Sequence, residues 1–397
     1  MHKRSTTARI HLQGKAVSPT VSTESTFITA TIAATEKRKV RCYDVPSAFV
    51  NTEVDKDVIT VLKGDLADMM VQMAPETYRK YITTDKKGTR ILYVKLQKAL
   101  CGLMRASLLF YRKLRKELEG YGLIVNPYDP CVANMMTKGG KQLTVAWHVD
   151  DLMVLCEDDF ELTKFLCYLG NIHGTKLSMH TGRKHDYLGV DMEFCEDGVL
   201  EVSMFKYLNN VIEDSPEIIR GRAAMPSHNK LFKIRDDAEA KKLSKEQVLA
   251  FHHTVAQLLF MATRARRDIQ TAMAFLTTRV KSPDEDDWGK LKRVLKYLNG
   301  TRYLKLQLTV KSMEMLKWYV DGSHNVHWDC EGHGGAVFTL GERATSIYLR
   351  KVKSNTRSLT ETELLTADMY MPKMLWSLHF IQSQGYEAEC VVYTKTT

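Results

Sequence analysis

Val149-Asp150-Asp151 stands between two apolar runs, Leu143 to Trp147 and Leu152 to Leu155. The glycines of Lys138-Gly139-Gly140 mark the turn of a hairpin that joins the first run to an earlier strand, Val132 to Met136. The stretch therefore predicts three consecutive strands, with two carboxylates exposed at the tight turn between the second and the third. Rigid strands on both sides make such a turn a precise place to build a metal site.

A third carboxylate comes earlier, in Asp44-Val45-Pro46-Ser47-Ala48-Phe49. Val40 to Asp44 has the pattern of a buried strand that ends at Asp44. Two carboxylates at a hairpin turn and a third from another strand could chelate two Mg²⁺ ions, which suits nucleotidyl transfer. One ion activates a 3′-hydroxyl, and the other stabilises the departing pyrophosphate. Two adjacent aspartates alone are more often turn or cap residues, so the motifs around them decide the interpretation.

The composition is that of a soluble globular protein with a basic surplus. The 397 residues are enough for two to four domains, with 44% hydrophobic and 26% charged residues. Lys and Arg number 57 against 47 Asp and Glu, which gives a net charge of +10. This surplus favours a polyanionic partner such as nucleic acid, although a basic soluble enzyme fits the charge equally well.

Cysteine usage and hydropathy indicate an intracellular protein. Eight cysteines are scattered without a C-x-x-C pair, which favours a reducing compartment. No apolar run is long enough to span a membrane, and the stretch from Met1 to Thr7 lacks the apolar core of a signal peptide.

Apolar spacing elsewhere predicts helices at 22–37 and 107–121, a short strand at 93–96 and helical structure over 253–275. Ser282-Pro283 followed by four acids predicts a helix start with Ser282 as the N-cap, and that helix continues to Gly300. Strands return from Leu316. The mixture of antiparallel strands and helices predicts an α+β fold.

The order of motifs along the chain resembles one family, the reverse transcriptase–RNase H region of the Pol polyprotein of copia-type LTR retrotransposons. The resemblance extends from about Val17 to the end of the chain. The segments that carry it, in family order, are Asp44 to Asn51 (family D-V-x-x-A-F-L-N), Leu96 to Arg105, Tyr128 to Val132 (Y-D-P-C-V), His148 to Asp151 (Y-V-D-D), Tyr187 to Met192 (F-L-G-x-x-I), Met261 to Ile269, Trp288 to Thr301 and Ser358 to Leu364.

The resemblance implies a palm with a four-stranded antiparallel sheet flanked by helices, partial fingers, a helical thumb and connection, and an incomplete RNase H-like α/β domain. The expected boundaries are 1–16 for a disordered or decayed N-terminus, 17–200 for fingers and palm, 201–315 for thumb and connection, and 316–397 for the truncated RNase H-like domain.

The resemblance also assigns roles to residues. Asp44, Asp150 and Asp151 resemble the palm carboxylates that bind two Mg²⁺ or Mn²⁺ ions. The Asp44 side chain is therefore expected about 4–6 Å from the Asp150 carboxylate, close enough to share a metal ion. Val45 resembles a position that offers its backbone carbonyl to a metal. Phe49 resembles the steric gate beneath the sugar of the incoming nucleotide. The positions that resemble template–primer contacts are Gly102, where a side chain would block close approach, His148, and the primer-grip residues Leu188 and Gly189.

Several positions depart from the family pattern. His148 and Cys101 replace tyrosines, and only a scrambled remnant at 4–15 stands where triphosphate-binding basic residues are usual. Asp321 and Glu363 resemble two carboxylates of a vestigial RNase H site, while Lys395 stands where a third belongs. The sequence therefore looks like a truncated copy, and RNase H activity is expected to be lost.

The resulting functional prediction is an RNA-directed DNA polymerase. Its expected partners are an RNA template, a DNA primer, the RNA–DNA hybrid and deoxynucleoside triphosphates, with no membrane. The expected location is a cytoplasmic virus-like particle or the nucleus, and the region is expected to belong to a larger Pol polyprotein. The alternative is a catalytically inactive, nucleic-acid-binding remnant of the same element.

A separate metal site is conceivable at His324, His327, Cys330 and His333, which follow one another at three-residue spacing. Residues three apart in an extended segment alternate faces and are not expected to converge, so a polar loop is the preferred interpretation.

Overall fold

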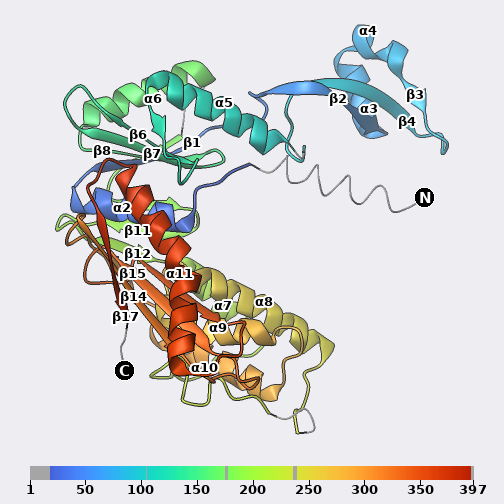
Figure 1. Cartoon of the computed structure of the whole chain (residues 1–397). Coiled ribbons are helices and arrows are strands. Elements are labelled where there is room, and N and C mark those ends of the chain that lie inside the picture. The colour runs from blue at the N-terminus through green and yellow to red at the C-terminus, as the bar shows by residue number, and fades with distance from the viewer. Residues whose placement is uncertain (1–17, 104, 175–177, 236–238, 395–397) are drawn as a thin grey trace.

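The structure, a computed structural model, describes residues 18–103, 105–174, 178–235 and 239–394. They form four sheets with helices packed around them, and the predicted α+β class is confirmed. In Figure 1 the chain bends into an open arch, with one sheet projecting as an arm at the top and helices gathered at the bottom. The expectations for residues 1–16 and for Lys395 fall outside the described residues.

The upper body of the arch is built on a central sheet in which every neighbouring pair of strands is antiparallel. The sheet has six strands, so the prediction of four was wrong; the extra ones are two-residue and three-residue edge strands. The strand order is β5 (Ile124–Val125), β6 (Val132–Met136), β7 (Gln142–His148), β8 (Asp151–Cys156), β1 (Lys39–Asp44) and β9 (Ser178–His180).

Helices α5 (Ala106–Tyr121) and α6 (Asp159–His173) pack on this sheet and on each other. The Tyr111 ring of α5 stacks on the fully buried Trp147 of β7 at 6.3 Å between centroids. Large rings of this kind bury much apolar surface, so they fix the register of the hairpin that carries the acidic turn.

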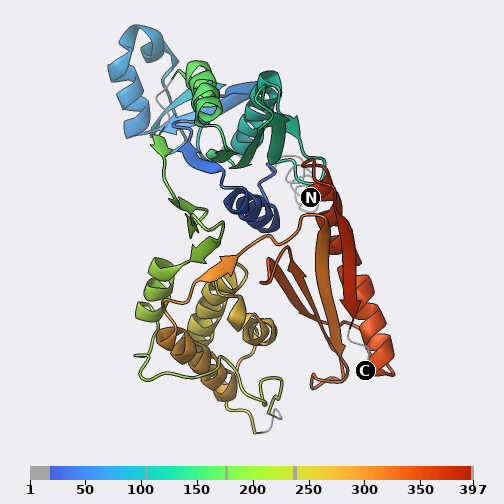
Figure 2. The same cartoon turned by 90° about the vertical axis from the view of Figure 1, so that its left-hand side faces the viewer.

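Helix α2 (Thr23–Thr35) is buried on all sides, from Ser25 to Ala34, and lies between the central sheet and the lower half of the molecule (Figure 2). Its threonines remain compatible with burial because their hydroxyls bond to the helix backbone. Thr31 Oγ1 donates to the carbonyl of Phe27 at 2.6 Å. The helix begins at the N-cap Ser22, whose side chain accepts from the N–H of Ser25.

The arm is a three-stranded sheet that leaves the central sheet after β1 and returns before α5 (Figure 1). Its strand order is β2-β4-β3, and its helices cover one side. The elements are β2 (Glu53–Lys63), α3 (Asp65–Met73), α4 (Pro75–Tyr78), η1 (Arg79–Tyr81), β3 (Thr83–Thr84) and β4 (Arg90–Lys98).

The lower half begins with a second antiparallel sheet, β10-β11-β12-β13. A series of helices comes between β12 and β13 in the sequence. The sheet strands are β10 (Lys184–Tyr187), β11 (Val190–Phe194), β12 (Leu200–Ser203) and β13 (Leu306–Leu308). The helices are α7 (Phe205–Glu213), α8 (Lys245–Ala262), η2 (Arg267–Ile269), α9 (Gln270–Arg279) and α10 (Glu285–Gly300).

The start of α10 differs from the prediction. Asp284, not Ser282, is the N-cap: its side chain accepts from the N–H of Asp287, and the Asp287 side chain accepts in return from the N–H of Asp284. Asp284 is buried and its backbone also bridges to Lys242, whereas Ser282 is exposed. Serine and aspartate are both favourable N-cap residues, and the tertiary contacts of Asp284 explain why it is the N-cap here.

The C-terminal sheet has the order β16-β15-β14-β17, and its only parallel pair is β14 with β17. Its elements are β14 (Met315–Ser323), β15 (His333–Thr339), β16 (Ser346–Lys351), α11 (Leu359–Gln382) and β17 (Glu389–Thr394). Helix α11 covers one face. Gly322 allows it to approach closely, because a Cβ there would lie 2.8 Å from Thr366 Oγ1.

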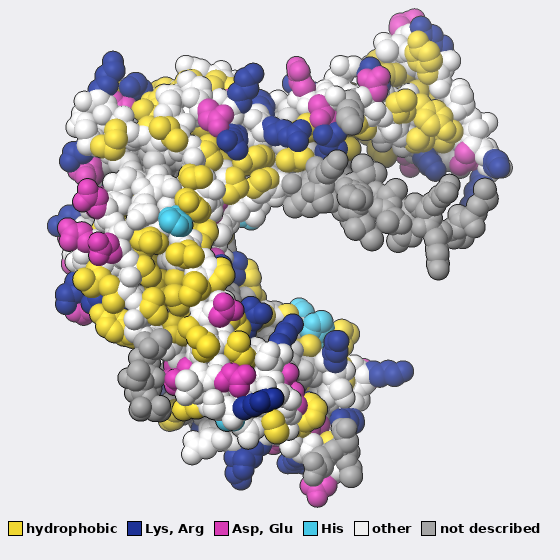
Figure 3. Space-filling view, in the orientation of Figure 1, with side chains coloured by type: hydrophobic (Ala, Val, Ile, Leu, Met, Phe, Trp, Pro, Cys, Tyr) yellow, Lys and Arg dark blue, Asp and Glu magenta, His cyan; other side chains and the backbone are white. Residues whose placement is uncertain are grey.

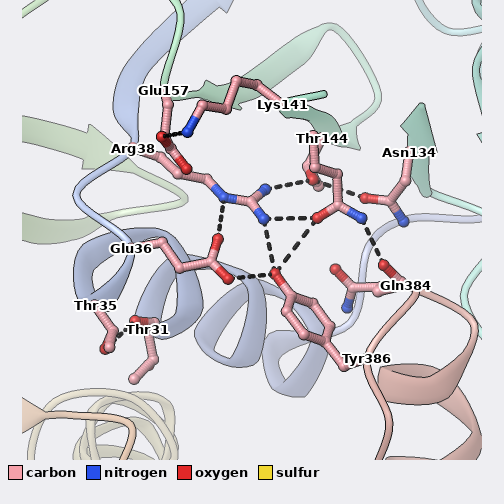
Figure 4. Close-up of polar contacts among 11 residues, drawn as sticks. Thr31, Thr35, Glu36, Arg38, Asn134, Lys141, Thr144, Glu157, Gln384 and Tyr386 are labelled. Carbon is pink, nitrogen blue, oxygen red and sulfur yellow. Dashed lines mark hydrogen bonds and ion pairs between the residues drawn. The ribbon is translucent and has the colours of Figure 1, made fainter. Parts of the chain in front are cut away.

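The C-terminal sheet is tied to the central sheet by a polar network around Arg38 (Figure 4). The Tyr386 hydroxyl accepts from Arg38 Nη2 at 2.7 Å and donates to Glu36 at 2.9 Å. Gln142 accepts from the same guanidinium at 2.6 Å, and its amide donates to the carbonyl of Gln384 at 2.5 Å. Among the described residues, no helix is both long and apolar enough to cross a membrane.

Candidate active site at the acidic turn

The acidic turn is a two-residue hairpin between β7 and β8. His148 pairs with Asp151, so only Val149 and Asp150 form the loop. Val149 has φ 59°, a left-handed conformation that glycine adopts freely and a β-branched residue adopts at a cost. The loop therefore exposes the acids on a backbone that two buried strands hold in place.

Strand β1 brings the third acid alongside. Asp44 is the direct partner of Asp151, and the N–H of Val45 donates to the carbonyl of Asp150 at 3.1 Å. Residues directly opposite in an antiparallel pair point to the same face, with Cβ atoms about 4.5–5.5 Å apart. Asp44 and Asp151 thus share one face at the same end of the sheet. The shared-metal distance between Asp44 and Asp150 stays a prediction.

The three carboxylates influence one another electrostatically. Burial and the charge of Asp150 raise the pKa of Asp44 above its ordinary value. Burial, then Asp150 and Asp44, raises the pKa of Asp151, while His148 acts in the opposite direction. Mutual repulsion of this kind means that the site would bind positive charge favourably.

The donor set fits a hard divalent cation, because carboxylate oxygens are the ligands that Mg²⁺ and Mn²⁺ prefer. Within the described ranges, no three side chains of His, Cys, Asp or Glu converge closely enough to hold a metal ion. The acids are therefore neighbours along two paired strands, and their side chains are not arranged around a single point.

The residues after Asp44 divide between core and surface. Val45, which follows Asp44 directly, is buried at 1% exposure. Phe49 is half-buried, and its ring meets the buried Phe110 of α5 edge-on, with centroids 6.3 Å apart. Phe49 therefore packs against the core on one side and remains partly exposed. Its role as a steric gate stays a prediction.

The hairpin at Leu188-Gly189 lies beside the acidic turn. Both residues have positive φ, 55° and 73°, as a two-residue turn between the paired Tyr187 and Val190 requires. The Tyr187 hydroxyl is buried 3.5 Å from the carbonyl of Asp151. The preceding Asp186 is a further charge that raises the pKa of Asp151.

Sequence patterns did not single out Asp186, although it immediately precedes the segment from Tyr187 to Met192 that resembles a family motif. The closeness of Asp186 to Asp151 depends on how two separate sheets meet, for which the sequence carries no local signal.

Gly102 was expected to permit close approach of another group. Its φ of 89° requires glycine, but a Cβ there would meet no atom of the described chain within 4 Å. The positive φ, and not a close contact, is therefore the reason that position 102 requires glycine.

In the C-terminal sheet, Asp321 lies on β14 and Glu363 on α11, and the two are neighbours through Gly322. A Cβ on Gly322 would lie 3.2 Å from the Cα of Glu363. The Asp321 side chain lines a pocket on the opposite face of the sheet from α11. Their pairing as hydrolytic carboxylates stays a prediction.

The expectation that the spaced histidines would not converge was wrong for one pair. His327 and His333 flank a turn, and His327 Nε2 lies 3.1 Å from His333 Nδ1. His324 instead bonds to Thr356 and Thr362, and Cys330 is exposed. Only two of the four therefore meet, which is too few to hold a zinc ion.

Comparisons of the sequence with family models and with known proteins agree on one family. Residues 4–219 match the family described as "Reverse transcriptase (RNA-dependent DNA polymerase)". The chain is 24% identical over 383 residues, 95% of its length, to the retrovirus-related Pol polyprotein from transposon TNT 1-94 of Nicotiana tabacum. It is also 24% identical, over 276 residues, to the putative transposon Ty5-1 protein YCL074W of Saccharomyces cerevisiae, covering 67% of this chain and 84% of that protein.

The chain spans 27% of the Nicotiana polyprotein and 24% of a similar one from transposon RE2 of Arabidopsis thaliana. It therefore corresponds to about a quarter of these relatives. Among solved structures, a foamy viral protease-reverse transcriptase in complex with RNA/DNA hybrid aligns with a TM-score of 0.48 at 9% identity, over 90% of this chain and 44% of that one.

Proposed function

This chain belongs to the reverse transcriptase family of copia-type retrotransposon Pol polyproteins, and on that premise we propose that it extends a DNA primer on an RNA template. The observation that carries the proposal is the pairing of Asp44 with Asp151 beside the strained turn at Val149-Asp150. Three mutually repelling carboxylates at one end of a rigid sheet suit chemistry that depends on divalent cations.

We assign the binding of two Mg²⁺ or Mn²⁺ ions to Asp44, Asp150 and Asp151, with the carbonyl of Val45 as a further oxygen ligand. When bound, such ions supply activation of the primer hydroxyl and charge neutralisation on the pyrophosphate. Paired strands β1 and β8 keep Asp44 and Asp151 in register, and we assign to Phe49, whose ring packs on Phe110, the role of steric gate beneath the sugar.

The expected place for template and primer is the hollow side of the arch. Figure 3 shows a broad concavity between the arm and the lower half, with Lys and Arg side chains over the junction of arm and upper body. Because β1 ends at Asp44 and the arm begins at Glu53, the acids lie near the root of the arm. His148, Gly102, Leu188 and Gly189 are the proposed template–primer contacts.

In family terms, we propose that the central sheet is the palm, the arm the fingers, α7–α10 the thumb and connection, and residues 316–397 an RNase H-like domain. A role for Asp321 and Glu363 in hydrolysing RNA is not part of this proposal. The surrounding Pol polyprotein, its virus-like particle and its location belong to the same proposal and rest on the relatives alone.

The test is primer extension on an RNA template with Mg²⁺ or Mn²⁺ and deoxynucleoside triphosphates. Wild-type chain should incorporate nucleotides, and Asp150→Asn or Asp151→Asn should lower the rate by about a hundredfold or more, as the loss of several kcal/mol of transition-state stabilisation implies. Asp197→Asn, in an exposed turn after β11, is the matched control and should retain the wild-type rate. Template–primer binding without incorporation would favour the alternative of an inactive nucleic-acid-binding protein.

A further inference from the structure

A pocket of about 530 Å³ lies over the face of the C-terminal sheet that α11 leaves uncovered. Its floor is formed by β14, β15 and β17, and its other wall by Phe232 and by Thr271 of α9. Phe232 is held by edge-on and tilted contacts with Phe275, His327 and His333. The pocket is part of neither the central sheet nor the acidic turn.

One side of this pocket is aromatic. Tyr319 and Tyr393, cross-strand neighbours on β14 and β17, stack with centroids 5.1 Å apart and planes at 15°. They remain 46% and 43% exposed, which is unusual for stacked rings within a sheet. On the side of Tyr319 away from Tyr393, the cross-strand neighbour is Val337, a smaller side chain that also lines the pocket.

A carboxylate stands two residues further along the same strand face. Asp321 lines the pocket, and among the described residues its side chain has no hydrogen-bond or ion-pair partner. Its cross-strand neighbour is Gly335, where a Cβ would lie 2.9 Å from Leu349. The Leu349 side chain therefore lies over Gly335 and forms an apolar wall of the pocket next to the carboxylate.

A buried neutral imidazole completes the lining. His333 is only 8% exposed, and its Nε2 has no partner among the described residues. Burial, and then the neighbouring His327, lowers the pKa of His333 to about 4. At neutral pH the ring therefore carries no charge, and this nitrogen is still able to form one hydrogen bond.

We propose that this pocket binds an amino-substituted nucleobase. The base would lie over Val337 and stack on the side of the Tyr319 ring turned away from Tyr393, while its exocyclic amino group donates to the Asp321 carboxylate. Every nucleobase offers a π-face for such stacking, and a carboxylate accepts hydrogen bonds but cannot donate them. A phosphate group would be repelled by Asp321, and a purely apolar ring would leave that carboxylate without a partner.

This binding site goes beyond polymerisation, because it needs no metal and uses none of the residues assigned to the acidic turn. A nucleobase held here would lie between the C-terminal sheet and the helices α7–α10, away from the primer end. It would therefore engage a free nucleoside or an unpaired base.

The experiment measures adenosine and inosine binding by calorimetry, with EDTA present so that metal-dependent binding is excluded. The two nucleosides differ on one edge of the purine: inosine has an oxygen in place of the 6-amino group, and its N1 carries the hydrogen that adenosine lacks there. Adenosine should bind saturably and about tenfold more tightly than inosine, as expected for a hydrogen bond to a charged acceptor. Asp321→Ala should reduce adenosine affinity to that of inosine.

Tyr319→Leu should weaken both nucleosides by about fivefold or more, because it removes the stacking surface. Thr271→Trp, at an exposed position on the opposite wall, fills the pocket without altering the sheet and should have the same effect. Tyr303→Leu is the matched control: Tyr303 is also exposed and stacks on another ring, Phe205, but it does not line the pocket, so its loss should change nothing.

Three results would overturn the proposal: no saturable adenosine binding, equal binding of inosine, or binding that survives both Tyr319→Leu and Thr271→Trp. Adenosine binding abolished by Asp151→Asn but not by Tyr319→Leu would place the nucleoside at the acidic turn instead. Primer extension is measured separately, so failure here leaves the polymerase proposal intact.

Discussion

Val149 keeps a backbone conformation that valine disfavours, with φ 59° in the turn between β7 and β8. A left-handed β-branched residue costs about 1–2 kcal/mol. Val149→Gly is therefore expected to raise the free energy of unfolding by about 1 kcal/mol in urea denaturation. Val199→Gly is the control, since Val199 is also half-buried next to a hairpin turn but has no positive φ, and it should lower stability. A similar loss in both variants would contradict the strain at Val149.

The repulsion among the acids should appear in the pH dependence of stability. The pKa of Asp151 is raised above its ordinary 3.8, so the folded state binds this proton more tightly than the unfolded chain. Stability consequently falls as pH rises through the carboxyl range and stays lowered at neutral pH. Asp151→Asn should raise Tm at pH 7, and the gain should vanish at about pH 3, where the carboxyl is neutral in both states.

The effect of Mn²⁺ on Tm gives a second test of the role of Asp151. It should raise the Tm of the native chain, because binding to the folded state alone stabilises it, and it should not raise the Tm of Asp151→Asn. A gain in Tm from Asp151→Asn that persists unchanged at about pH 3 would show that the effect is packing and not charge.

Phe49 is expected to set sugar selectivity. Phe49→Val should increase ribonucleotide incorporation relative to deoxyribonucleotide incorporation in single-nucleotide assays, because a smaller side chain leaves room for a 2′-hydroxyl. Phe110→Leu, which alters the buried partner of Phe49 and leaves the ring in place, is the comparison. Unchanged selectivity in Phe49→Val would make Phe49 an ordinary half-buried aromatic residue.

Among the helices, α10 shows why one of two possible N-cap residues, Asp284, is used and the other, Ser282, is not. Asp284 and Asp287 cap each other, and Arg279 Nε binds Asp287 at 2.9 Å. Asp284→Ala should cost about 1–2 kcal/mol in the free energy of unfolding. Ser282→Ala, at the position that the sequence favoured, should change it by less than about 0.5 kcal/mol. A larger loss in the free energy of unfolding for Ser282→Ala than for Asp284→Ala would show that Ser282 is the functional N-cap.

Elements with a local signal could be predicted from sequence, and those that depend on distant partners could not. The β6–β7–β8 unit follows from alternation and the glycines at 139–140, and α5 from its apolar stripe. Strand β9 has three residues and is defined by its pairing with β1, so no local pattern reveals it. The same holds in the site: Asp44 and Asp151 belong to motifs, whereas Asp186 reaches them only through the contact of two sheets.

At the scale of the whole molecule, the Arg38 network joins parts of the chain almost 350 residues apart. Tyr386→Phe removes a hydroxyl that accepts from Arg38 and donates to Glu36, and should cost about 1–2 kcal/mol. The loss should appear as faster hydrogen exchange in α11 with little change in β7, because the C-terminal sheet would open first. Tyr303→Phe, an exposed tyrosine, is the control. Equal acceleration in both elements would mean that the two sheets unfold as one unit.

The position of β1 in the central sheet also has a consequence for synthesis on the ribosome. Its neighbour β8 begins at Asp151, more than a hundred residues after Asp44, and its other neighbour, β9, comes later still. At about 5–20 residues per second, β1 would wait roughly 5–20 s before either partner is translated. During that interval Val40 and Cys42, buried in the finished fold, have no sheet to enter. A nascent chain stalled before Asp151 should therefore bind chaperones through this strand, and one stalled well after His180 should not.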